Sequence, residues 1–230
     1  MANIYKSEAG RRAVEDQYRR ILGRWPVACE QRVVPTRQGD TFVIVSGSAS
    51  APPVVLFHGS GTNSAAWMRD VATWAQHHRV YAVDIIGEPG LSAPSRPRLA
   101  SPAHAEWLDD VWTGLGLENA SVVGISLGGW IGLDYAVRRP NRVASLSLIC
   151  PAGIGSQNMM LLLKVGLLRL FGTRGLLKSL ELVSGRTATL PAARLRTMID
   201  TYYTESGLDP QGRPLAQSLA QTAAGTEQTI

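Results

Sequence analysis

A short stretch near the middle of the chain constrains the fold most strongly. Residues 121–130 read S-V-V-G-I-S-L-G-G-W, so a β-branched run leads directly into the pattern G-x-S-x-G with Ser126 at its centre. A helical pattern begins immediately afterwards and continues to Arg139. A strand, a sharp turn and a helix in this order hold the central serine in a strained backbone conformation that exposes its hydroxyl. The stretch therefore predicts a serine at the tip of a central strand, with its hydroxyl lifted clear of the sheet.

The glycines of the pattern support this interpretation. Gly124 and Gly128 stand two residues before and two residues after Ser126. We expect a Cβ at either position to collide with the neighbouring strand or helix. In a chain with 23 glycines the alternative is that the pattern arose by chance. The strand before it and the helix after it favour the structural interpretation.

This order of elements resembles the nucleophile elbow of the α/β-hydrolase fold, and more narrowly that of its carboxylesterase-like members. The resemblance covers residues 25–155 well. It implies that Ser126 is a catalytic nucleophile that forms an acyl-enzyme with a small-molecule carboxylic ester. The partner implied is thus a small ester substrate.

A second motif carries the same resemblance. The apolar run Val54–Phe57 ends in His58-Gly59-Ser60-Gly61. In the family, the backbone N–H after the His-Gly pair and the N–H after the nucleophile form the oxyanion hole, which implies Ser60 and Leu127 as donors here. The residues expected to line the site are His58, Gly59, Gly124 and Gly128. We expect the His58 ring to pack inward and hold its loop, not to act as a base.

Alternating strand and helix patterns predict an α/β fold, with a mostly parallel twisted sheet and helices on both faces. Residues 27–35 and 41–46 read as an antiparallel hairpin at one sheet edge. Further strands are expected at 54–57, 79–84, 121–125 and 143–150, and helices at 7–24, 64–77, 101–115 and 127–139. The run 54–57 is apolar on both faces, which is typical of a buried parallel strand. Asp84 is expected to bond loop backbone in a structural role.

The same patterns divide the chain into four parts: an amphipathic helix (1–25), an α/β-hydrolase core (26–156), a helical cap (157–206) and a polar tail (207–230). Residues 159–171 are apolar nearly all round, interrupted only by Lys164 and Arg169. The run is too short and too charged to span a bilayer. The resemblance implies a cap over an acyl pocket. The alternative is a basic amphipathic helix that lies on a membrane interface.

Composition and charge narrow the class of protein. Hydrophobic residues at 45% and charged residues at 18% are typical of a folded chain. The net charge is +5, but no lysine/arginine block interleaves with aromatics, so we expect no nucleic-acid partner. The first residues contain no apolar segment of a signal peptide, which predicts a cytoplasmic location. Cys29 and Cys150, each beside an apolar run, are expected to be buried, reduced thiols.

No motif for a cofactor or metal is found. No G-x-G-x-x-G follows a strand, and neither G-x-x-x-x-G-K-[ST] nor H-E-x-x-H occurs. His77 and His78 are adjacent at a helix end, so their side chains point in different directions and do not share a metal. We therefore expect no cofactor and no metal ion.

The expected catalytic base is missing. The family's chain order is Ser, then Asp or Glu, then His, whereas all four histidines here precede Ser126. Nothing after Cys150 resembles the two further strands that would carry the acid and the histidine. His104, in the first turn of its helix, is expected on the surface. The resemblance therefore stops short of the C-terminal part of the hydrolase fold.

The missing base lowers the activity expected of the chain. In a serine protease, loss of the histidine costs on the order of 10⁶ in kcat, while the oxyanion hole and binding retain roughly 10³ over water. The sequence thus predicts a weak or inactive esterase, and the alternative is a catalytically silent, truncated hydrolase that serves as a binding or assembly module.

The missing strands also affect the sheet. Without them, the strand Val143–Cys150 becomes a sheet edge, which predicts self-association or a partner chain there.

Overall fold

The computed structural model describes residues 4–5, 7–99 and 101–154, with a few isolated positions between 164 and 182. The predicted cap (157–206) lies almost entirely outside the described residues, and the predicted tail (207–230) lies wholly outside them. The chain divides into two compact units, one of residues 1–6 and 18–154 and one of residues 7–17 and 155–230. The sheet and the candidate site belong to the first unit.

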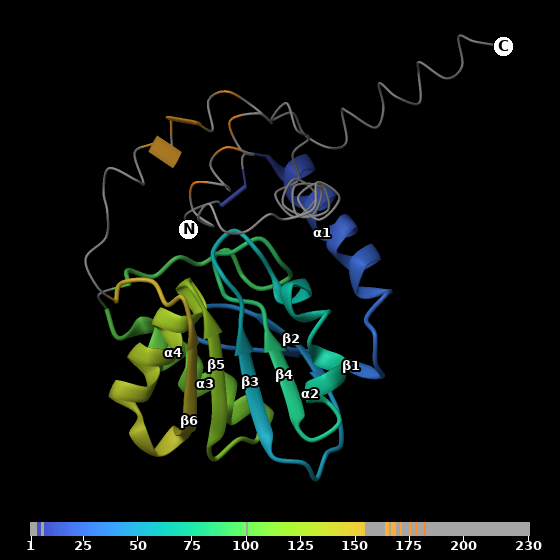
Figure 1. Ribbon diagram of the computed structural model, residues 1–230, viewed down its shortest axis with the longest axis vertical. Coiled ribbons are helices and arrows are strands. Elements are labelled where there is room, and N and C mark those ends of the chain that lie inside the picture. The colour runs from blue at the N-terminus through green and yellow to red at the C-terminus, as the bar shows by residue number, and fades with distance from the viewer. Residues whose placement is uncertain are drawn as a thin grey trace, which may run out of the picture. The chain divides into compact units, whose positions relative to one another are not determined.

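The first unit is built on a six-stranded mixed sheet (Figure 1). Its strands are β1 (Cys29–Val34), β2 (Thr41–Ser46), β3 (Pro53–Phe57), β4 (Arg79–Val83), β5 (Ala120–Ile125) and β6 (Val143–Ile149). Their spatial order is β1-β2-β4-β3-β5-β6, with β1, β2 and β4 paired antiparallel. The pairs β4–β3, β3–β5 and β5–β6 are parallel. The predicted α/β fold and edge hairpin are confirmed.

The described helices are α1 (Glu8–Leu22), α2 (Val71–Trp74), α3 (Ala103–Leu115) and α4 (Leu127–Arg138), with 3₁₀ turns η1 (Ser64–Trp67) and η2 (Pro140–Arg142). Within the described part of the chain, no helix has both the length and the apolar character needed to cross a bilayer.

The single helix predicted over residues 64–77 is wrong, because η1 and α2 replace it. Asn63 caps η1 through its side chain, which accepts a hydrogen bond from the Ala65 amide. The amide and the hydroxyl of Ser64 both donate to Asp84, so the first turn is tied to a neighbouring loop. These contacts outweigh the local preference for one continuous helix.

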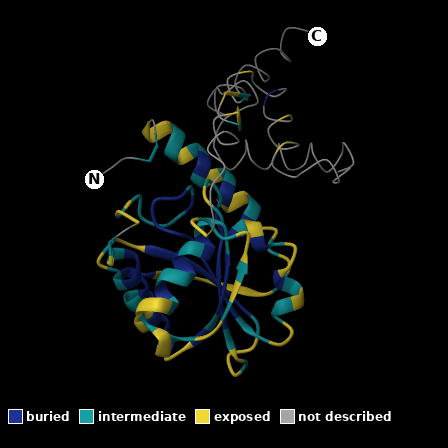
Figure 2. Ribbon diagram, turned by 60° about the vertical axis from the view of Figure 1, so that its left-hand side comes forward, coloured by how far each residue is buried: buried dark blue, intermediate teal, exposed yellow. Residues whose placement is uncertain are grey.

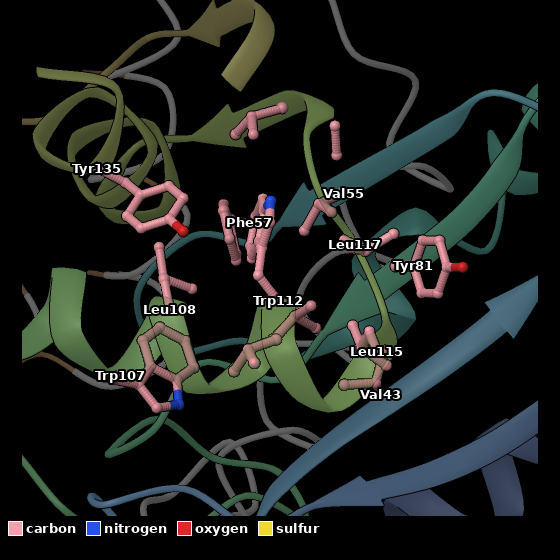
Figure 3. Packing of buried hydrophobic residues seen from close by; sticks show 14 of the residues in the cluster. Val43, Val55, Phe57, Tyr81, Trp107, Leu108, Trp112, Leu115, Leu117 and Tyr135 are labelled. Carbon is pink, nitrogen blue, oxygen red and sulfur yellow. The ribbon is translucent and has the colours of Figure 1, made fainter. Parts of the chain in front are cut away.

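Alternation along the central strands places apolar side chains on both faces of the sheet. Val55 and Phe57 of β3 join a cluster formed with α3 and α4, which contains Trp107, Trp112 and Tyr135 (Figure 3). Val54 and Leu56 of the same strand join a second cluster. The second cluster also contains Tyr18, Trp67 and Val71 from α1, η1 and α2. Both faces of β3 are therefore covered, as its continuous apolar run predicts.

The two edges of the sheet are exposed, whereas its central strands are buried (Figure 2). Cys29 begins edge strand β1 and Cys150 directly follows edge strand β6. Both cysteines are free and exposed, so the prediction of buried thiols is wrong. An apolar run indicates burial only where other elements cover it, and an edge strand lacks a neighbour on one side.

A buried carboxylate joins α1 to the loops beyond β4. Asp84 is 1% exposed and accepts hydrogen bonds from the Tyr18 hydroxyl (2.9 Å), the Ser64 hydroxyl (2.7 Å) and the Leu91 amide (2.9 Å). This network confirms the structural role predicted for Asp84. Burial, together with the Asp84 charge, raises the pKa of Tyr18 well above its usual value. Tyr18 therefore stays protonated and donates to the carboxylate.

We expect Tyr18→Phe to lower the free energy of unfolding by about 1–3 kcal/mol, because a buried hydrogen bond to a charged acceptor is lost. Tyr81→Phe is the matched control, since Tyr81 is also buried but its hydroxyl bonds to no described residue. Urea unfolding followed by tryptophan fluorescence measures both. An equal loss of unfolding free energy in the two variants would show that the hydrogen bond from Tyr18 to Asp84 does not stabilise the fold.

Candidate active site

The turn between β5 and α4 is strained at Ser126. This residue has φ 50° and ψ −110°, a backbone conformation that residues other than glycine rarely adopt. The Ser126 amide donates to the carbonyl of Ile149 at 3.0 Å, and the Ser126 carbonyl accepts from the amide of Ala152 at 2.9 Å. The end of β6 and the loop after it therefore hold the turn on both sides.

The flanking glycines allow the close approach that the turn needs. A Cβ on Gly124 would collide with the carbonyl of Gly128, the second residue of α4. A Cβ on Gly128 would collide with the carbonyls of Phe57 and His58 at the end of β3. The expected collisions are thus present, and glycine lets α4 begin directly against the point where the His58-Gly59 loop leaves the sheet.

The two segments predicted to form the site lie together. A Cβ placed on Gly59 would stand 3.8 Å from the Cβ of Ser126, so the loop after β3 contacts the turn after β5. Ser60 follows directly and is exposed. Leu127 is the first residue of α4, and amides at this position have no acceptor within their own helix. The arrangement can present backbone N–H groups beside a serine hydroxyl.

His58 is buried and bonded through both ring nitrogens. Its Nε2 accepts from the amide of Ile85 at 2.9 Å, so the ring proton is on Nδ1, which donates to the Gly59 carbonyl at 2.8 Å. Burial lowers the pKa of His58 and keeps the ring neutral. The structural role predicted for this histidine is confirmed, and the ring is not available to take a proton from Ser126.

His104 is not on the surface, so that prediction is wrong. It is 5% exposed and lies edge-on against Trp107 at 6.5 Å and Trp130 at 6.0 Å between ring centroids. Positions 104, 107 and 108 share one face of α3, and Trp107 and Leu108 on this face belong to the core cluster that contains Phe57 of β3. Burial also lowers the pKa of His104, and its Nδ1 has no hydrogen-bond partner among the described residues.

The remaining histidines are remote in the sequence from the turn. His77 is exposed and His78 half-buried in the turn after α2. Within the described residues no hydrogen bond joins the hydroxyl of Ser126 to an imidazole. The serine that the sequence predicts as a nucleophile thus has no imidazole bonded to it among the described residues.

Glu88 contacts the loop after β3, and the sequence analysis missed this contact. The residue is 6% exposed, and its Oε2 accepts from the Gly61 amide at 2.5 Å and the Ser60 hydroxyl at 3.2 Å. The guanidinium of Arg96 lies 3.6 Å from the other oxygen. The available signal was an acidic residue in a glycine- and proline-containing loop after a central strand, where the loops of a parallel sheet converge.

The described residues contain no group of three or more His, Cys, Asp or Glu side chains able to hold a metal ion. The structure also contains an open groove, which none of the residues of the serine turn lines. It is lined by Pro35, Thr36, Arg37, Asp110, Thr113 and Gly114, between the hairpin turn and α3. None of the predicted site residues belongs to it.

Comparison with known proteins agrees with this geometry. Residues 52–207 match the family model described as alpha/beta hydrolase fold. The chain is 41% identical over 135 residues to the uncharacterized carboxylesterase Nap of Bacillus subtilis, covering 59% of this chain and 45% of the relative. It is 42% identical over 135 residues to carboxylesterase YbfK of the same organism, covering 59% of this chain and 46% of the relative. The chain therefore spans about half the length of these curated relatives.

Solved structures show the same likeness. Naproxen esterase (carboxylesterase NP) from Bacillus subtilis superimposes with a TM-score of 0.71 at 32% identity, covering 88% of this chain and 68% of that one. Carboxylesterase CesB (YbfK) from the same organism gives a TM-score of 0.69 at 31% identity, covering 90% of this chain and 73% of that one. With its sheet order, its strained serine turn and a family match over more than half its length, the chain belongs to the α/β-hydrolase fold family.

Proposed function

We propose that the protein is a serine hydrolase that acts on small carboxylic esters through an acyl-enzyme at Ser126. The observation that carries the proposal is the positive φ of Ser126 at the tip of β5, with the Gly59 loop against it. A serine held this way presents its hydroxyl beside backbone N–H groups, which is the arrangement that acyl transfer uses. The printed names of the relatives, carboxylesterases from Bacillus subtilis, favour esters as the substrate class.

In the proposed reaction the Ser126 oxygen attacks the ester carbonyl carbon, and the carbonyl oxygen becomes an oxyanion. The amides of Ser60 and Leu127 donate to this oxyanion. Collapse of the tetrahedral intermediate expels the alcohol and leaves an acyl ester on Ser126, which water then hydrolyses. His58, Gly59, Gly124 and Gly128 shape the site through the close contacts and hydrogen bonds of their loops.

The rate of this reaction depends on a base. The proton of Ser126 must move to a base and from there to the leaving alkoxide. His58 is bonded through both nitrogens, and no other histidine bonds to Ser126 in the described part of the chain. Because the loss of a catalytic histidine costs on the order of 10⁶ in kcat, we propose slow turnover by the 230-residue chain. A silent binding or assembly module is the second candidate, favoured by the same absence of a bonded base.

An active-site fluorophosphonate tests the nucleophile. We expect slow covalent labelling of the chain, lost in Ser126→Ala, because phosphonylation requires an activated hydroxyl in contact with the probe. Ser145→Ala is the matched control, since Ser145 is an exposed serine on β6 whose hydroxyl bonds only to Ser121 among the described residues. Intact-mass spectrometry measures the labelled fraction with time. Absence of labelling in the unchanged chain would reject the enzyme and favour the silent module.

We also propose that the edge near Val143–Cys150 takes part in self-association. Strand β6 pairs only with β5 among the described residues and carries no charged side chain to oppose pairing with another strand. Ile149 at its end is 46% exposed. An uncharged apolar edge is a surface on which a second copy can add strands.

Ser147→Lys tests the edge, because a lysine on an exposed edge position opposes strand pairing. We expect the unchanged chain to sediment as a concentration-dependent oligomer and the variant to shift toward monomer. Ala49→Lys adds the same charge in the exposed loop between β2 and β3 and should leave sedimentation unchanged. A cooperative, unchanged monomer at all concentrations would contradict self-association.

A further inference from the structure

We propose that Glu88 is a positioning residue of the loop after β3, where its carboxylate fixes Ser60 and Gly61 so that the Ser60 amide is directed toward the oxyanion of the reacting ester. The inference rests on the proposed function, which supplies the oxyanion, and adds to it a residue that acts through others. Glu88 comes from the loop after β4, so the positioning group and the positioned loop belong to neighbouring strands.

The contacts define the direction of the loop. One oxygen of Glu88 accepts from the Gly61 amide at 2.5 Å and from the Ser60 hydroxyl at 3.2 Å. The Glu88 carboxylate therefore holds two donors from adjacent residues on the same side of the loop after β3. The Ser60 amide itself donates to no described backbone carbonyl or side chain, and it remains the donor of this residue that is free to bind a ligand atom.

The loop needs such an anchor because it contains two glycines. Gly59 and Gly61 flank Ser60, and Gly61 has φ 75° with open space where a Cβ would be. Glycine has more backbone conformations to lose than any other residue, so a free H-G-S-G loop would sample many orientations of the Ser60 amide. Donors that are already oriented before the reaction stabilise a developing charge most effectively. A charge-assisted hydrogen bond supplies that order more strongly than a neutral one.

The charge of Glu88 would oppose an oxyanion nearby, and Arg96 offsets it. The guanidinium lies 3.6 Å from Glu88 Oε1, and the Nε of Arg96 donates to the Gly87 carbonyl at 2.7 Å. Gly87 has φ 74°, and a Cβ there would collide with the Arg96 side chain. The loop after β4 thus places a cation next to the buried carboxylate and offsets part of its charge.

The full 230-residue chain with the variants Glu88→Ala, Glu88→Gln and Arg96→Gln tests the role. The readouts are the maximal rate constant for fluorophosphonate labelling at Ser126 and the probe concentration at half-maximal rate. For Glu88→Ala we expect the rate constant to fall about 10- to 100-fold, since loss of a single oxyanion donor costs on the order of 10²–10³. Glu88→Gln keeps one acceptor and should lose less. The half-maximal concentration should stay within about 2-fold, since an oxyanion donor acts on the transition state.

Hydrogen exchange separates positioning from folding. In Glu88→Ala the Gly61 amide should exchange faster, while amides of β3 and β5 exchange as before. Asp109→Asn is the matched control, because Asp109 is a carboxylate on α3 that also bonds an arginine, Arg139. It should change neither the labelling rate nor Gly61 exchange. Arg96→Gln should slow labelling without releasing the Gly61 amide, since it removes the compensating charge and leaves the bond.

The outcomes are distinguishable. If the unchanged chain is not labelled, the proposed function fails and the positioning role fails with it. If the chain is labelled and both Glu88 variants react at the native rate, the positioning role alone is rejected. It is also rejected if the slower rate comes with faster exchange throughout the sheet in both Glu88 variants, because the residue would then serve folding.

Discussion

The backbone strain at Ser126 is the constraint on which the rest of the site depends. A φ of 50° is unfavourable for serine and persists only because the surroundings determine it from several sides. The end of β6 bonds the Ser126 amide, and the loop after β6 bonds its carbonyl. Gly128 lets α4 start against the end of β3. The strained turn therefore requires β3, β5 and β6 to be correctly aligned.

Around this turn, buried carboxylates order the loops. Asp84 and Glu88 both follow β4, and both accept hydrogen bonds from backbone amides of other loop residues, Leu91 and Gly61. Loops lack the regular backbone pairing of strands, so their amides need other acceptors when they are buried. A carboxylate can accept several donors at once, as Asp84 does from Tyr18 and Ser64. Charge-assisted hydrogen bonds thus order the loops at the carboxyl ends of the strands, beside the apolar packing of Ile85 and Ile86 in the core.

The features that the sequence predicts correctly are those encoded by short-range patterns. The G-x-S-x-G turn, the edge hairpin, the doubly buried β3 and the inward-facing His58 each follow from a few neighbouring residues. The failures depend on distant contacts. Burial of His104 needs Trp130 of another helix, and the break after Trp67 needs the bonds from Ser64 to Asp84. The thiols are exposed because of the position of their strands in the sheet. The loop position of Glu88 is a weak local signal, and its contacts with Ser60 and Gly61 of the loop after β3 do not follow from it.

The distinction between local patterns and distant contacts also separates the two requirements of the proposed acyl transfer, a serine beside oriented amides and a base. A strained serine and oriented amides are properties of backbone geometry at the ends of adjacent parallel strands, so a chain that forms β3, β5 and β6 can assemble both. A base is a side chain that must reach the serine from elsewhere in the fold. In the described residues His58 has both nitrogens engaged in holding the loop, and releasing either would cost the order on which the amides depend. His58 is thus committed to holding the loop after β3, and the proposed proton transfer requires a group distinct from it.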